Sequence, residues 1–114
     1  AAMAVRAWRS YRPGTTDMRD TISSEKIDKY LDTTKRALDK LKIAAPPRSF
    51  GLRMAQDFLS MATSYYNDAL HFRSIGDYVN SFASVNYAHG WLDCGARIGL
   101  FDVGEDDRLF TLYE

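Results

Sequence analysis

The sequence predicts an all-α fold, a three-helix antiparallel bundle with a basic N-terminal arm and a short apolar C-terminal tail. Apolar residues recur every three to four positions in three stretches, and turn-forming residues separate those stretches. The 114 residues, 46% hydrophobic and 26% charged, suffice for one globular core. We therefore expect an arm over residues 1–22 and one helical bundle domain over residues 23–114.

The first helix is expected to begin at Ser23 and Ser24. A serine there can accept hydrogen bonds from the free amides of the first helical turn. The residues that follow form one apolar seam, and the charged residues lie largely off it. The seam comprises Ile27, Leu31, Thr34, Leu38 and Leu41. We expect the segment Ala44–Pro47 to end this helix, because proline has no amide and restricts the residue before it.

A helical hairpin should follow, with its turn at Gly76 and Asp77. Ser49 suits the N-cap of the second helix, and Asp77 suits that of the third, which should run to Arg97. Gly76 can adopt the left-handed conformation that closes the second helix. The inward stripe of the third helix is expected to hold Val79, Phe82, Val85, Asn86, His89, Leu92 and Ala96.

Large and small residues between Tyr65 and Ala88 resemble one tetratricopeptide unit. Any two antiparallel helices that cross closely need small residues at the crossing and large ones beside it, so the likeness is geometric. A solenoid needs about three repeats, and the sequence shows no second copy. We therefore expect a tetratricopeptide-like hairpin inside a bundle. Gly95 and Gly99, four positions apart, are expected to serve packing and helix capping.

The two ends of the chain differ in character. The arm combines arginines with aromatic residues, namely Arg6, Arg9, Arg12, Trp8 and Tyr11. That combination would suit phosphate and base contacts, but we favour a loosely packed tail. The segment Leu109–Tyr113 is too apolar for a solvated end and should lie across the bundle or dock on another chain. The candidate interface residues are Trp91, Leu109, Phe110 and Tyr113.

Composition limits the classes of partner. Fifteen basic and fifteen acidic residues cancel, so no overall field attracts nucleic acid or an anionic membrane. The lone Cys94 excludes an internal disulfide and a zinc site built from several thiolates, and it favours a reducing cytoplasm. No apolar run approaches the roughly 20 residues that span a bilayer. We expect a cytoplasmic protein, without a cofactor, that binds a protein partner or itself.

One group of polar side chains could take part in catalysis or ligand binding, namely Asn86, His89, Asp93 and Arg97. Spacings of three and four residues put all four side chains on one face of a helix. His89 could act as an acid or base oriented by Asp93, and Arg97 could hold an anion. With no evident nucleophile and no glycine-rich phosphate loop, a structural polar seam is favoured, and we predict no catalytic residues. A metal site would need more ligands than His89 and Asp93 provide, and we predict none.

Residues 86–101 read NYAHGWLDCGARIGLF, and through this segment the chain resembles an archaeal family known only as domain of unknown function 357. The Gly76–Tyr78 turn and the closing Leu109–Thr111 also resemble it, so the likeness covers roughly Ser24 to the C-terminus. Cys94 stands where alanine is expected, and we assign its thiol no role. The resemblance implies a compact helical fold and an archaeal cytoplasm, and it brings no established activity.

The sequence leaves three functions open. The favoured one is a noncatalytic protein-interaction or self-association module, because the chain has more aromatic residues than three short helices need inside. The second is an enzyme or a binder of a small phosphate or nucleotide that uses His89, Asp93 and Arg97. The third is nucleic-acid binding through the basic arm, which the zero net charge disfavours.

Overall fold

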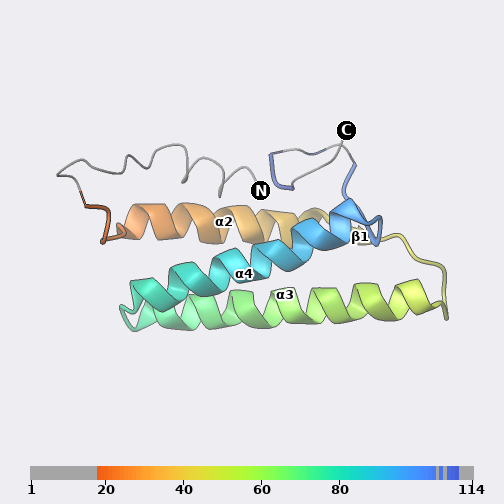
Figure 1. Cartoon of the computed structure of the whole chain (residues 1–114), viewed down its shortest axis with the longest axis horizontal. Coiled ribbons are helices and arrows are strands. Elements are labelled where there is room, and N and C mark those ends of the chain that lie inside the picture. The colour runs from red at the N-terminus through yellow and green to blue at the C-terminus, as the bar shows by residue number, and fades with distance from the viewer. Residues whose placement is uncertain (1–17, 105, 107, 111–114) are drawn as a thin grey trace.

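The computed structural model describes residues 18–104, 106 and 108–110. This part of the chain holds three helices and two short strands: α2 (Ser24–Lys40), β1 (Lys42–Ile43), α3 (Phe50–Ser74), α4 (Tyr78–Arg97) and β2 (Phe101–Asp102). The three helices run side by side, and α4 lies between α2 and α3 in the view of Figure 1. The predicted all-α three-helix bundle is confirmed.

Each helix begins at the N-cap that the sequence predicts. The hydroxyl of Ser23 accepts from the amide of Lys26 at 3.2 Å, and that of Ser49 accepts from Leu52 at 3.0 Å. The carboxylate of Asp77 accepts from Asn80 at 3.1 Å. These bonds satisfy amides that have no partner within the helix, which is why the short polar residues start the helices here.

Two of the helices end at a glycine in the left-handed conformation. Gly76, with φ 81°, follows α3, and Gly99, with φ 83°, follows α4. In both cases the amide of the residue after the glycine donates to a carbonyl oxygen of the last helical turn. Asp77 donates to Phe72 and Leu100 donates to Gly95, each at 2.9 Å. This geometry is the Schellman motif, and it confirms the expected capping roles of both glycines.

The end of α2 differs from the prediction. The helix stops at Lys40 and not at the segment Ala44–Pro47, and Leu41 is its C-cap. The chain then forms β1, in which Ile43 pairs with Phe101 of β2 in an antiparallel register. A backbone hydrogen bond from Ala44 to Leu100 at 2.9 Å extends this pairing. The prediction was wrong because a partner strand nearly sixty positions away competes with the helix, and local periodicity does not reveal it.

A ladder of small residues forms the contact between α3 and α4. It comprises Ala55, Ala62 and Ala69 on α3 and Ser81, Ala88 and Gly95 on α4, all of them buried. The hydroxyl of Ser81 donates to the carbonyl of Ala69 at 2.8 Å, which fixes the register of the two antiparallel helices. Because both sets repeat every seven residues, the same register places Ala62 opposite Ala88. The two helices can therefore approach closely.

Helix α2 covers one side of this hairpin. Its buried residues are Ile27, Tyr30, Leu31, Thr34 and Ala37, while its lysines, arginine and aspartates are exposed, as predicted. The ring of Tyr30 stacks on that of Phe82 of α4, with centroids 4.9 Å apart. Val79 was expected on the same inward stripe but is 73% exposed. It lies roughly 120° round the helix from the buried Val85, which turns it away from α2.

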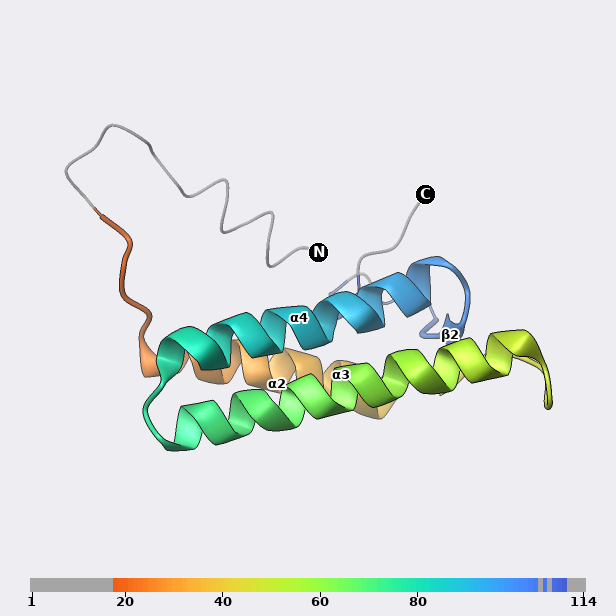
Figure 2. The same cartoon turned by 60° about the horizontal axis from the view of Figure 1, so that its bottom comes forward.

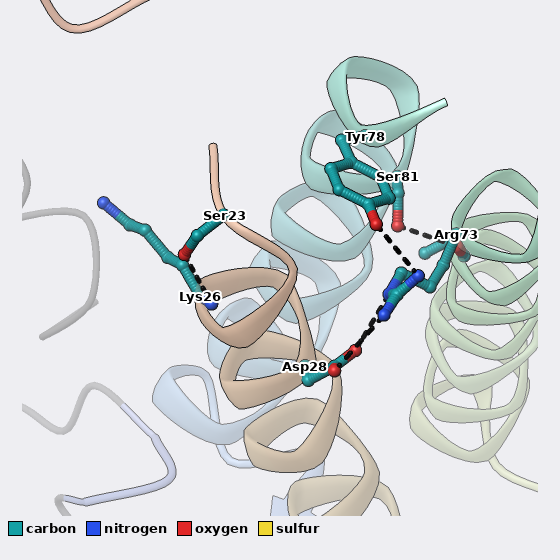
Figure 3. A network of polar contacts seen from close by, with 7 residues as sticks. Ser23, Lys26, Asp28, Arg73, Tyr78 and Ser81 are labelled. Atoms are coloured by element: carbon teal, nitrogen blue, oxygen red, sulfur yellow. Dashed lines mark hydrogen bonds and ion pairs between the residues drawn. The ribbon is translucent and has the colours of Figure 1, made fainter. Parts of the chain in front are cut away.

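Polar contacts join all three helices near the hairpin turn (Figure 3). The guanidinium of Arg73 on α3 donates through Nε to Oδ1 of Asp28 on α2 at 3.0 Å and through Nη1 to the hydroxyl of Tyr78 on α4 at 3.2 Å. The Ser81 bond lies beside them in the same view. Hydrogen bonds therefore reinforce the bundle at the end where α3 turns into α4.

Gly95→Ala is expected to lower the free energy of unfolding by about 1–3 kcal/mol. The reason is that a Cβ at this position would overlap the ring of Phe101. Gly90→Ala is the matched control, since a Cβ there meets no atom within 4 Å, and it should stabilise the helix by roughly 0.5–1 kcal/mol. Urea unfolding followed by circular dichroism measures both changes. Equal stability of the two variants would contradict the close packing at Gly95.

Candidate functional site

Three polar side chains meet inside the bundle between α2 and α4. Thr34 is fully buried, and His89 and Asp93 are 4% and 8% exposed. Thr34 Oγ1 lies 3.1 Å from His89 Nδ1, and His89 Nε2 lies 3.6 Å from Asp93 Oδ1. We refer to these residues as the buried polar group. Its imidazole ring lies between a hydroxyl on one helix and a carboxylate on its own.

Burial sets the protonation of this group. It lowers the pKa of His89 from the ordinary value of 6.5, while the Asp93 carboxylate and a hydrogen bond with the backbone of Leu109 act in the opposite direction. Since burial is the largest effect, the ring is neutral at pH 7. A neutral ring has one donor and one acceptor nitrogen. When Thr34 donates to Nδ1, the ring hydrogen lies on Nε2, the nitrogen that faces Asp93.

The C-terminal segment closes over the buried polar group. Leu109 and Phe110 are 7% and 2% exposed, and the ring centroids of Phe110 and His89 lie 6.4 Å apart. Asp106 fixes the start of this segment through an ion pair of 2.7 Å with Lys40. Leu109 and Phe110 are thus core residues, as expected if the C-terminal segment lies across the bundle. They are not exposed interface residues, because the bundle itself supplies their apolar partners. Tyr113 lies outside the described residues.

The other two members of the predicted constellation are less buried than this group. Asn86 is half-buried, and Arg97 is exposed at the last turn of α4. The structure therefore brings His89 and Asp93 together, and it adds Thr34, which the sequence analysis had placed in an apolar seam. The four predicted residues do not form one accessible surface. The described residues hold no group of three or more potential metal ligands. None of the described helices has the length and apolar character needed to cross a membrane.

A second candidate site lies on the opposite side of the hairpin. Trp91 and Tyr87 are each two positions from His89, roughly 200° round α4, and so point away from the side that contacts α2. Figure 2 shows α2 behind the hairpin of α3 and α4, with the other side of the hairpin towards the viewer. We call this side the outer face. It has one seam on α3 and one on α4. The α3 seam comprises Phe50, Met54, Asp57, Phe58, Met61, Ser64, Tyr65 and Asp68, and the α4 seam comprises Asn80, Ser84, Tyr87, Trp91, Cys94 and Ile98, the C-cap of this helix.

Aromatic rings connect the two seams of the outer face. Trp91 packs edge-on against Phe58 and Tyr87, with centroids 5.0 and 6.2 Å apart, and Tyr87 packs edge-on against Tyr65 at 4.5 Å. Tyr87 is 51% exposed, while Phe58, Tyr65 and Trp91 are half-buried. The buried Nε1 of Trp91 has no hydrogen-bond partner among the described residues. Trp91 therefore contributes by packing.

Sequence reasoning identified Trp91 but not this arrangement around it. Phe58 and Tyr65 lie seven residues apart on α3, and they meet Trp91 and Tyr87 only because of the register that the small-residue ladder imposes. The heptad spacing of alanines on α3 and of Ser81, Ala88 and Gly95 on α4 is a signal that could have revealed the pairing.

Comparison with known proteins gives one match. A family model described as "Protein of unknown function (DUF357)" matches residues 29–101. This range includes most of α2, all of α3 and α4, the buried polar group and the outer face, and it ends before Leu109 and Phe110. No curated protein and no solved structure matches the chain.

The free energy of unfolding is expected to fall as the pH decreases below 6.5, the ordinary pKa of histidine. Below this pH the unfolded chain binds a proton at His89, whereas the folded chain does not until the pH reaches its lowered pKa. The contribution of the neutral ring to stability is therefore complete above the ordinary pKa and is lost between that pH and the lowered pKa of the folded state. Urea unfolding over a pH series measures the slope. His89→Gln should flatten it, whereas His71→Gln, at an exposed position, should retain it. The same slope in all three proteins would contradict the assignment.

Proposed function

The chain belongs to the DUF357 family of proteins of unknown function, and from this premise we propose that it is a noncatalytic protein-interaction module whose contact surface is the outer face. The proposal rests on one observation: no described helix covers the outer side of the α3–α4 hairpin (Figure 2), and Met61, Tyr87 and Trp91 lie on that side. Contiguous apolar surface of this kind marks interaction sites on soluble proteins, and tryptophan and tyrosine contribute strongly to binding there.

The outer face has the features of an interface centre. Phe58, Tyr65 and Trp91 are held in place by one another, so binding would cost little side-chain entropy. Tyr87 and Ile98 are more than half exposed and offer apolar area that a partner can bury. A rigid aromatic centre with accessible neighbours is the arrangement that typically provides most of the binding energy of an interface.

The buried polar group supports this choice over a catalytic or ligand-binding one. His89 and Asp93 are enclosed by α2 and by the segment that carries Leu109 and Phe110. A general acid or base must come within hydrogen-bond reach of its substrate. In this structure the group instead bonds across the interior, where it links α2 to α4.

A photoreactive residue at position 87 is expected to form a discrete adduct with a partner protein. Replacing Tyr87 by p-benzoylphenylalanine keeps an aromatic ring on the outer face and allows cross-linking in cells that naturally produce the protein. Gel shift and mass spectrometry of the adduct identify the partner. The same residue at position 79 is the matched control, since Val79 is an exposed apolar residue of α4 that lies outside the outer face.

The adduct should also depend on the face around it. Ile98→Glu places a charge at an exposed position of the outer face, seven residues after Trp91. It should reduce the yield of the adduct from position 87 by about tenfold, the effect of losing roughly 1.4 kcal/mol of binding energy. Adducts of equal yield and identity from positions 87 and 79, or none from either, would contradict the proposal.

A further inference from the structure

The C-terminal segment is tied to the bundle at two places. We call its described residues, Asp106 and 108–110, the strap. At its start, Asp106 pairs with Lys40 and accepts two backbone amides of the turn that follows, at 3.0 and 3.2 Å. Further along, the side chains of Leu109 and Phe110 belong to the apolar core. The strap is therefore joined to the bundle by one ion pair and two buried side chains.

The second half of the strap also covers His89. The imidazole ring is hydrogen-bonded to the backbone of Leu109, and the ring of Phe110 lies beside it at an interplanar angle of 30°. Its other neighbours are Thr34 of α2 and Asp93 of its own helix. Helix α3 packs on the small-residue side of α4, roughly 100° round that helix from His89. Among the described residues, the charge that acts on the ring is that of Asp93.

A second proton on His89 would leave the ring with partners but without water. Both ring nitrogens would then carry hydrogens. The Thr34 hydroxyl can turn to accept one of them, and the Asp93 carboxylate faces the other. Burial nevertheless opposes the charge, because it is the largest effect on the pKa of His89 and lowers it. The charged ring is therefore stabilised by a movement that lets water reach it.

Of the elements that enclose His89, the strap can move at the lowest cost. Separating α2 from α4 would break the stack of Tyr30 on Phe82 and expose the buried face of a 17-residue helix. Lifting the strap exposes two large side chains, those of Leu109 and Phe110. Segments with few buried contacts open locally at a lower free energy than packed helices. A proton at His89 should therefore displace the strap before it separates the helices.

We propose that the strap is an acid-operated switch: when His89 takes up a proton, Leu109 and Phe110 leave the bundle while α2, α3 and α4 stay packed. Lys40 holds the pKa of Asp106 below its ordinary value of 3.8, so their ion pair persists in the pH range where histidine titrates. The released strap thus remains attached at Asp106. Release uncovers two apolar side chains and the core surface beneath them. This inference does not depend on the outer face or on the proposed function.

Fluorine NMR of the full chain tests the switch. A single 4-fluorophenylalanine at position 110 distinguishes a buried ring from a solvated one. Its signal should change to the solvated form as the pH falls from about 7.5 to about 4.5, with a midpoint below 6.5, the ordinary pKa of histidine. The same residue at position 82 is the matched control, because Phe82 stacks on Tyr30 between α2 and α4. Its signal and the helical circular dichroism should stay unchanged.

Variants assign the transition to His89 and to the strap. His89→Gln should remove the change at position 110, whereas His71→Gln, at an exposed position of α3, should keep it. Lys40→Met loosens the start of the strap and should raise the midpoint towards 6.5, because an easier opening lets His89 become charged at a higher pH. Lys35→Met, which removes the ion pair with Asp39, should leave the midpoint unchanged.

Three outcomes would overturn the switch. A buried signal at position 110 down to about pH 4.5 would show that the strap does not respond to acid. Simultaneous changes at positions 110 and 82, with loss of helical circular dichroism, would show that acid unfolds the whole bundle. A change at position 110 that persists in His89→Gln would assign the transition to another group. If that variant does not fold, the ring signals of His89 in the wild-type chain decide, since they must titrate with the midpoint of position 110.

Discussion

The close contact between α3 and α4 is the constraint on which the rest of the structure depends. Alanine, serine and glycine repeat every seven residues along the two helices, and the bond from Ser81 to Ala69 fixes their antiparallel register. No large side chain fits along this line, so the bulky residues of both helices must lie on the two flanks of the hairpin. Gly95 also leaves space for the ring of Phe101. Phe101 begins β2, and β2 pairs with β1, the strand that follows the end of α2.

The two flanks are used differently. On one flank α2 and the C-terminal segment cover the hairpin and enclose Thr34, His89 and Asp93. A buried imidazole with partners on both sides specifies how α2 lies on α4, because a shift of one turn would leave a buried ring nitrogen unpaired. The other flank keeps its aromatic residues in contact with one another, with Tyr87 partly exposed and no described helix over them.

This division connects packing with the proposed function. The close packing of α3 on α4 brings the rings of Phe58 and Trp91 together edge to face, with centroids 5.0 Å apart. Well-packed aromatic side chains of this kind typically provide much of the binding energy of an interface.

The sequence by itself determined the helices, because caps and periodicity are local. Each helix cap depends only on neighbours within about one turn. The N-caps are Ser49 and Asp77, and the left-handed glycines that end helices are Gly76 and Gly99. The tertiary structure decided everything that needs two distant segments: the early end of α2, the burial of Leu109 and Phe110 over His89, and the pairing of aromatic residues on the outer face. A residue's spacing predicts which side of its own helix it occupies, but only packing decides whether another segment covers that side.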